Sequence, residues 1–195
     1  MLVLALMPTL LCSGTLGEVI DVGDVESLLA AAELPSLPTH VNSSEIPRFV
    51  LAPSVRSSAT RTIVVREGVY ELPRSLVLRS GHRITSHPGH EVRIQLAATV
   101  PHPVVSMHNV TDVTVSGIMV VGHNHSTEQL QRAMAVEIVG GADVTLYQLT
   151  VVGGVRVTGG WRHHVNQSNI SNPHGAAGGH CVYFTSAGDA LTLAR

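Results

Sequence analysis

Apolar residues alternate with polar ones along most of the chain, at a spacing of two positions. The alternation is clearest in the pairs Val113/Val115, Ile118/Val120, Val136/Ile138, Leu149/Val151, Val155/Val157 and Val182/Phe184. A spacing of two, carried by β-branched residues and leucine, is typical of short β-strands. The spacing of three and four that an amphipathic helix requires does not occur in this repeating region, so the pattern predicts a chain built mainly from strands.

The alternation recurs as one repeat in three copies. The copies are Asn109–Val120, Gly140–Val151 and the more degenerate Gly159–Ile170, with offsets of 31 residues (113 to 144) and 19 residues (144 to 163). Equivalent positions form these columns: Val113, Val144 and His163; Val115, Leu146 and Val165; Ile118, Leu149 and Ser168; Val120, Val151 and Ile170; and, one strand earlier, Met107, Ile138, Val157 and Phe184. About three strand-like pairs per repeat, separated by Gly, Asn or Asp, predict one rung of a parallel β-helix, with length differences placed at turns.

The region from Thr62 to Leu193 resembles the right-handed parallel β-helix of the pectin-lyase-like superfamily. The resemblance rests on an opening TIVVREGVYEL, on SLVLRSGHRITSHPGHEVRIQL, and on the rungs NVTDVTVSGIMV, GGADVTLYQLTV and VRVTGGWRHHVNQSNISN. It implies an all-β fold, a right-handed single-stranded parallel β-helix (solenoid) with a short N-terminal capping helix. The superfamily contains lyases, hydrolases, epimerases and non-catalytic adhesins, so the resemblance indicates a fold and leaves the reaction open.

The chain is expected to have three parts. Residues 1–17 hold an apolar run, too short to span a bilayer and followed by small residues, which predicts a secretory signal peptide; a buried first strand is the alternative. Residues 18–60 form an N-terminal cap and an irregular segment, with a helix from Asp24, its N-cap, to Glu33, before Pro35. Residues 61–195 form the β-helix, which is expected to be truncated at its C-terminus because neither a cap nor a polar rung follows Leu193.

Composition narrows the choice of partners. The net charge is −2, and the twelve basic residues are all arginine without a basic run, so a nucleic-acid partner is not expected. Five sequons, at Asn42, Asn109, Asn124, Asn166 and Asn169, are candidate glycosylation sites and support a secreted, extracellular protein. Cleavage of the signal peptide would remove Cys12 and leave Cys181 alone, which excludes a disulfide within the mature chain. No membrane span is expected after cleavage.

Alternation also predicts a candidate catalytic face. If the apolar residues of their strands point inward, Glu137, Arg156 and Tyr183 point outward and stack about 4.8 Å apart. Glu137 would act as general acid or base, Arg156 would stabilise developing negative charge, and Tyr183 would bind substrate. The alternative is an ordinary exposed ion pair beside a tyrosine ring. A glycosidase also requires two carboxylates at a defined separation, and this face offers one.

Histidines form a second candidate group. His174, in a glycine-rich loop, is a candidate catalytic residue, and His164 is a candidate substrate-binding residue. His163 falls in an inward column and would need a buried partner, unless the rung is slipped by one residue and His163 is exposed. The spacing of His174 and His180 fits no zinc site, so no metal is assigned.

Asp112, Asp143 and Asp189 recur at one turn and offer a possible calcium ladder, although aspartate is common at turns for local reasons. No other cofactor is expected.

Two classes of function remain. The first is a secreted protein that binds or processes extracellular polysaccharide, lyase-like or hydrolase-like, with a polysaccharide or glycan as its partner. The second is a non-catalytic extracellular β-helix scaffold or adhesin. An open end of the β-helix would also allow self-association, because unpaired strand edges favour pairing between chains.

Overall fold

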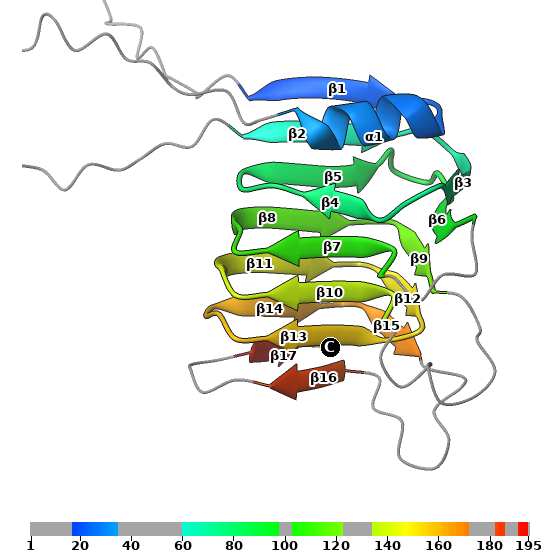
Figure 1. Ribbon diagram of the computed structural model, residues 1–195. Coiled ribbons are helices and arrows are strands. Elements are labelled where there is room, and N and C mark those ends of the chain that lie inside the picture. Colours follow the sequence, from blue (N-terminus) through cyan, green and yellow to red (C-terminus); the bar gives the residue numbers. More distant parts are fainter. Residues whose placement is uncertain are drawn as a thin grey trace, which may run out of the picture.

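The part of the chain that the structure describes consists mainly of parallel β-strands arranged in three sheets (Figure 1). The computed structural model describes residues 17–34, 60–97, 103–122, 134–171, 182–185 and 191–194, with side chains described up to Ser171 and for Val182. The irregular segment expected before residue 60 lies outside these ranges for the most part, as does the predicted signal peptide up to residue 16.

Each sheet collects every third strand of the chain. Sheet A contains, in order, β1 (Glu18–Val22), β2 (Arg61–Val65), β5 (His82–Ser86), β8 (Thr111–Ser116), β11 (Ala142–Tyr147), β14 (His163–Asn166) and β17 (Leu191–Ala194). Sheet B contains β3 (Gly68–Leu72), β6 (Val92–Leu96), β9 (Met119–Val121), β12 (Thr150–Val152) and β15 (Asn169–Ser171). Sheet C contains β4 (Leu76–Leu78), β7 (Val105–His108), β10 (Val136–Val139), β13 (Val155–Thr158) and β16 (Val182–Thr185). From β2 onward the chain passes through sheets A, B and C in turn, an order compatible with a β-solenoid.

The register between successive rungs follows the predicted columns. The paired residues are Val113 with Val144, Val115 with Leu146 and Val165, Val120 with Val151 and Ile170, and Met107 with Ile138, Val157 and Phe184. The prediction of three parallel strands per repeat is therefore confirmed, residue by residue in these columns. Each apolar residue lies above an apolar residue of the rung before it because the side chains of a strand alternate between its two faces.

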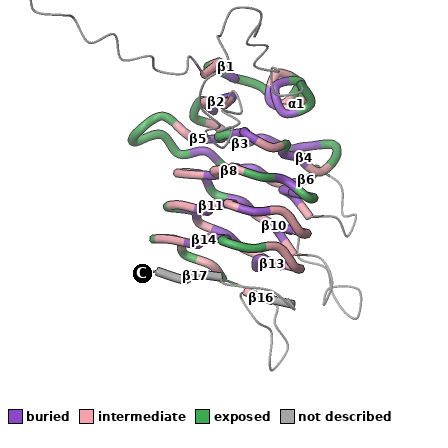
Figure 2. Tube along the Cα trace, turned by 90° about the vertical axis from the view of Figure 1, so that its left-hand side faces the viewer, coloured by how far each residue is buried: buried purple, intermediate pink, exposed green. Residues whose placement is uncertain are grey.

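The space between the three sheets is filled by the inward residues of the strands from β1 to β14. Ile63, Val65, Ile84, Val113 and Val144 are at most 1% exposed, whereas their sequence neighbours in the same strands are half-buried or exposed. The two classes alternate along the strands in Figure 2. Burying one such aliphatic side chain contributes roughly 1.5–3 kcal/mol, so a stack of rungs gains stability with each rung added.

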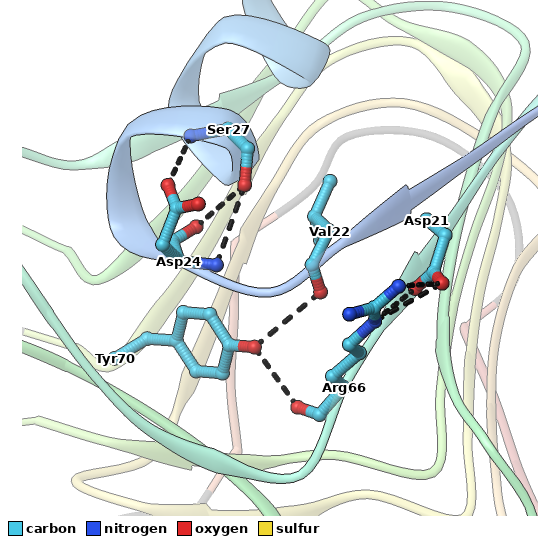
Figure 3. A network of polar contacts seen from close by, with 6 residues as sticks. All are labelled: Asp21, Val22, Asp24, Ser27, Arg66 and Tyr70. Carbon is cyan, nitrogen blue, oxygen red and sulfur yellow. Dashed lines mark hydrogen bonds and ion pairs between the residues drawn. The ribbon is translucent and has the colours of Figure 1, made fainter.

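The single helix of the described residues packs on the first rung. Helix α1 (Val25–Glu33) contacts β1, β2, β3 and β4 and buries Leu28, Ala31 and Ala32 (Figure 1). Asp24 is its N-cap, as predicted, and its carboxylate accepts a 2.8 Å hydrogen bond from the backbone N–H of Ser27 (Figure 3). That hydrogen bond is the main cause of the lowered pKa of Asp24.

Two arginines, Arg61 and Arg66, link the N-terminal strand and helix to the rest of the stack. Arg61, only 4% exposed, donates from Nη1 to the carbonyl of Leu34 at 2.7 Å and from Nε to Glu18 Oε2 at 2.8 Å. One side chain therefore joins β1, β2 and the C-terminal end of α1. Arg66 pairs with Asp21 on the surface, where the two side chains make a bidentate contact (Figure 3).

Replacing Tyr70 by phenylalanine is expected to lower the free energy of unfolding by about 1 kcal/mol. The ring is 3% exposed, and its hydroxyl donates a 3.0 Å hydrogen bond to the carbonyl of Arg66, with the carbonyl of Val22 at 3.5 Å (Figure 3). Tyr70→Phe would remove the hydroxyl from the partly buried carbonyl of Arg66, whereas the carbonyl of Val22 would keep its 2.9 Å hydrogen bond from the N–H of Arg66. Urea unfolding checks the value, with the half-buried Tyr147→Phe as control; equal losses in both variants would contradict the prediction.

Candidate functional site

The outer face of sheet C carries a column of polar side chains. The register pairs Val77 with Ser106, Ser106 with Glu137, Glu137 with Arg156, and Arg156 with Tyr183. The inward neighbours in these strands, among them Met107, Ile138 and Val157, are buried, which places the column on the opposite face. The predicted stacking of Glu137, Arg156 and Tyr183 is thus found in the strand register, although the side chain of Tyr183 lies outside the described set.

Glu137 is held between two basic groups. Its Oε1 lies 3.3 Å from Arg156 Nη1, and its Oε2 lies 3.7 Å from His108 Nε2. The side chains of Glu137 and Arg156 are 21% and 23% exposed, so their ion pair is largely shielded, whereas His108 is 55% exposed. The pair is therefore less exposed than the ordinary surface ion pair of the alternative, and its attraction is screened less by solvent.

His108 is a member of this cluster that the sequence analysis did not identify. It ends β7 and lies diagonally across from Glu137, because Ser106 is the residue directly opposite Glu137. Its position two residues after Ser106 was the available signal, since residues i and i+2 of a strand share a face. Many residues of the chain are expected to point outward by the same rule. Only the pairing of β7 with β10 shows that the His108 imidazole lies beside the Glu137 carboxylate.

A groove of about 270 Å³ opens at the α1 end of the same face. Its lining residues are Leu29, Ala32, Glu33, Arg74, Ser75 and Val77. Glu33 and Arg74 form an ion pair across it, and Val77 is half exposed. In the strand register, Val77 lies opposite Ser106, and Ser106 lies opposite Glu137. The groove at Val77 is therefore two strand spacings, about 10 Å, from Glu137.

The other predicted site residues do not join this cluster in the described structure. His164 lies on β14 of sheet A, opposite Thr145, and so belongs to a different sheet from Glu137 and Arg156. His174 lies outside the described residues. Within the described strands of sheet C, Glu137 is the sole carboxylate, so the pair of carboxylates that a standard glycosidase uses is not found there.

The proposed calcium ladder is interrupted in the described turns. Asp112 and Asp143 occupy equivalent turn positions with the same left-handed φ of 55°, as expected. The next equivalent position is Arg162, which donates two hydrogen bonds to the Asp143 carboxylate at 2.7 and 2.6 Å. Asp189 lies outside the described residues, and the described ones contain no group of three or more His, Cys, Asp or Glu that could hold a metal ion.

The sequons differ in accessibility. Asn109 is exposed at the turn from sheet C to sheet A, with a left-handed φ of 52°. Asn169 is exposed on β15, whereas Asn166 is half-buried on β14. Asn42 and Asn124 lie outside the described residues. Among the three described sites, Asn109 and Asn169 present the more accessible acceptor side chains.

Two histidines lie inside the stack. His82 and His163 are 0% and 1% exposed, so His163 occupies the inward column and the slipped-rung alternative is wrong. Burial is the main cause of the lowered pKa of both imidazoles; for His82 the charges of Arg61 and Arg79 add to it, and the pKa falls to about 4. Neither ring nitrogen of His163 makes a hydrogen bond within the described residues. The nearby backbone of Gly159 raises the pKa of His163 and so offsets part of the lowering by burial. Both rings face the core rather than the Glu137 cluster.

Comparison with known proteins adds no family. No family model matches the chain, and neither a curated protein nor a solved structure matches it. Within the described residues, no helix has the length and apolarity needed to cross a membrane. The functional argument therefore rests on the geometry of the chain itself.

Proposed function

We propose that this chain is a right-handed parallel β-helix of the pectin-lyase-like superfamily, secreted, that binds extracellular polysaccharide along the outer face of sheet C. The observation that carries the proposal is the group of Glu137, Arg156 and His108 on this face, with Glu137 and Arg156 stacked on successive rungs and His108 beside the carboxylate. Ser106, next in the register, is only 6% exposed and is not counted among the binding groups. These groups offer hydrogen-bond donors and acceptors at regular intervals of about 4.8 Å along the stack. An extended polymer lying along the axis would meet Glu137 and Arg156 on two successive rungs, with His108 beside them.

Binding is better supported than a complete catalytic set. Glu137 is a candidate general acid or base and Arg156 a candidate for stabilising a carboxylate or oxyanion. The described strands of this sheet add no second carboxylate, and the candidate His174 lies outside the described residues. A lyase needs one base and charge stabilisation rather than two carboxylates, so lyase chemistry fits Glu137, Arg156 and His108 better than glycoside hydrolysis does.

The second candidate function is a non-catalytic scaffold or adhesin. The observation that favours it is that Glu137 is already engaged by Arg156 at 3.3 Å, as a structural ion pair would be. Under this alternative the pair stabilises two neighbouring rungs and contacts no ligand. Secretion is common to both candidates and is supported by the apolar run Met1–Leu11 and by the sequons.

Glu137→Gln is expected to weaken polysaccharide binding by about tenfold, because an amide replaces a charged acceptor that forms the stronger hydrogen bonds. Affinity electrophoresis or calorimetry with a panel of acidic and neutral polysaccharides measures the effect. The matched control is Glu71→Gln, the same change on the outer face of sheet B, where Glu71 accepts a hydrogen bond from Gln95.

Three outcomes separate the candidates. A loss in Glu137→Gln with unchanged binding in Glu71→Gln supports the sheet C face as the binding surface. Appearance of unsaturated products, absorbing in the ultraviolet and absent with Glu137→Gln, would add lyase activity. Equal affinity in the wild type and both variants, with lowered thermal stability only in Glu137→Gln, contradicts the proposal and favours the scaffold.

A further inference from the structure

The turn from β13 of sheet C to β14 of sheet A carries an exposed tryptophan ring with an arginine over it. Trp161 is 54% exposed, and the guanidinium carbon of Arg162 lies 4.4 Å from the centroid of its ring system. Arg162 is in turn held by the bidentate contact with the Asp143 carboxylate of the preceding rung. Trp161 pairs with Ala142 through an isolated parallel bridge, which fixes the backbone that carries the ring.

Equivalent turns in the earlier rungs carry small or acidic residues. The two positions are Thr111 and Asp112, then Ala142 and Asp143, and finally Trp161 and Arg162. The second position has left-handed φ in all three turns, at 55°, 55° and 53°. Aspartate tolerates this conformation through local hydrogen bonding, whereas arginine does not have that compensation. The third turn thus keeps the backbone conformation of the other two and adds a large exposed ring, which the stacking of the rungs does not require.

The geometry leaves one side of the ring available. Arg162 lies over one face of Trp161, yet the residue is still 54% exposed, so a large part of the ring remains open to solvent. Asp143 and Arg162 stand beside it as acceptor and donor, and their opposite charges cancel. The cluster is therefore apolar on one face, rich in hydrogen-bonding groups at its rim, and without net charge.

We propose that Trp161, Arg162 and Asp143 form a glycan subsite that takes a neutral pyranose ring, stacked on Trp161 and hydrogen-bonded by its hydroxyls to Asp143 and Arg162. A pyranose suits this surface because its C–H face is apolar while its hydroxyls lie at the ring periphery, and tryptophan combines a large apolar face with a rigid side chain. An acidic sugar suits it less, because its carboxylate would have to displace Asp143 from Arg162. The inference rests on the proposed polysaccharide binding and specifies a sugar class and a second contact, around the corner from sheet C.

Trp161 is the single tryptophan of the chain, so intrinsic fluorescence reports on this site alone. The full chain is titrated with neutral hexaoses of β-1,4-linked glucose, mannose and xylose, and separately with hexagalacturonate. We expect at least one neutral hexaose to change the emission with saturation and hexagalacturonate to leave it unchanged. Calorimetry of Trp161→Ala with the same hexaose is expected to show affinity lowered about tenfold.

Control variants separate stacking from folding. Trp161→Phe retains an aromatic face and is expected to recover part of the affinity, whereas Met119→Ala removes an exposed apolar side chain from sheet B and is expected to have no effect. Thermal unfolding of each variant detects loss of fold. Wild-type protein that binds a glycan with loss in Glu137→Gln, but with unchanged emission and unchanged affinity in Trp161→Ala, overturns this subsite and leaves the sheet C proposal standing. No binding of any glycan overturns both.

Discussion

Gly141→Ala is expected to lower the free energy of unfolding by about 4 kcal/mol, a large part of the stability of an ordinary domain. Gly141 has φ of 78°, and a β-carbon there would overlap the carbonyl oxygen of Val110 and lie 2.7 Å from its amide nitrogen. Val110 belongs to the rung before, and its carbonyl accepts a 2.8 Å hydrogen bond from the N–H of Ala142. The clash is with backbone that the rung stacking holds in place, so local movement relieves little of it.

Gly159→Ala is the matched control for this effect. Gly159 also has left-handed φ, at 69°, but a β-carbon there meets nothing within 4 Å. Its cost is therefore the backbone term alone, about 1–2 kcal/mol. Urea unfolding of the two variants separates conformational strain from close approach between rungs. Equal losses at the two positions would show that Gly141 and Val110 are not in close contact in solution.

Acid is expected to destabilise the protein through its buried histidines, and His82→Leu is expected to remove about 3 kcal/mol of this pH dependence. The folded-state pKa of His82 is about 4, against an ordinary value of 6.5. The unfolded state therefore binds the proton more readily. Stability is full above about pH 6.5 and falls as the pH decreases, until His82 is also protonated in the folded state below about pH 4. His163, whose pKa is lowered as well, adds to the loss in the same direction.

Urea unfolding at about pH 7.5 and about pH 4 measures the free energy of unfolding at each pH, and the difference between the two gives the sensitivity to acid. Leucine fills a similar space without a titrating group, so His82→Leu should be less sensitive to acid than the wild type, whatever its stability at neutral pH. The control is His90→Leu, which removes an exposed imidazole and is expected to change the difference much less. An unchanged difference in His82→Leu would mean that water reaches the His82 ring in the folded state.

The candidate site was predictable in part. Alternation placed Glu137 and Arg156 outward, and the repeat offset placed them in one column, because both follow from the strand period and the rung length. The pairing of His108 with Glu137 was not predictable, since it depends on a diagonal contact between neighbouring strands. His164 was grouped with the site because it is close in sequence to other histidines, but the turn between sheets C and A places it on another sheet.

The contacts of Trp161 were likewise not predictable from the sequence. The repeat aligns Trp161 and Arg162 with Ala142 and Asp143, but this alignment does not indicate what Arg162 contacts. The structure shows that Arg162 binds the Asp143 carboxylate and lies 4.4 Å from the centroid of the Trp161 ring. These are contacts between side-chain ends, which the backbone periodicity does not specify.

The sequence by itself determined the strand period, the number of strands per rung, the register of the apolar columns and the helix that packs on the first rung. Each depends on local or strictly repeating information: the alternation of side chains, the repeat length, and a capping residue such as Asp24. Tertiary structure decided that His163 remains inside despite its polar ring, that Arg61 joins β1, β2 and α1, and that Glu137 lies between Arg156 and His108. These outcomes depend on which atoms of neighbouring rungs meet, and that is set by packing between segments distant in the sequence.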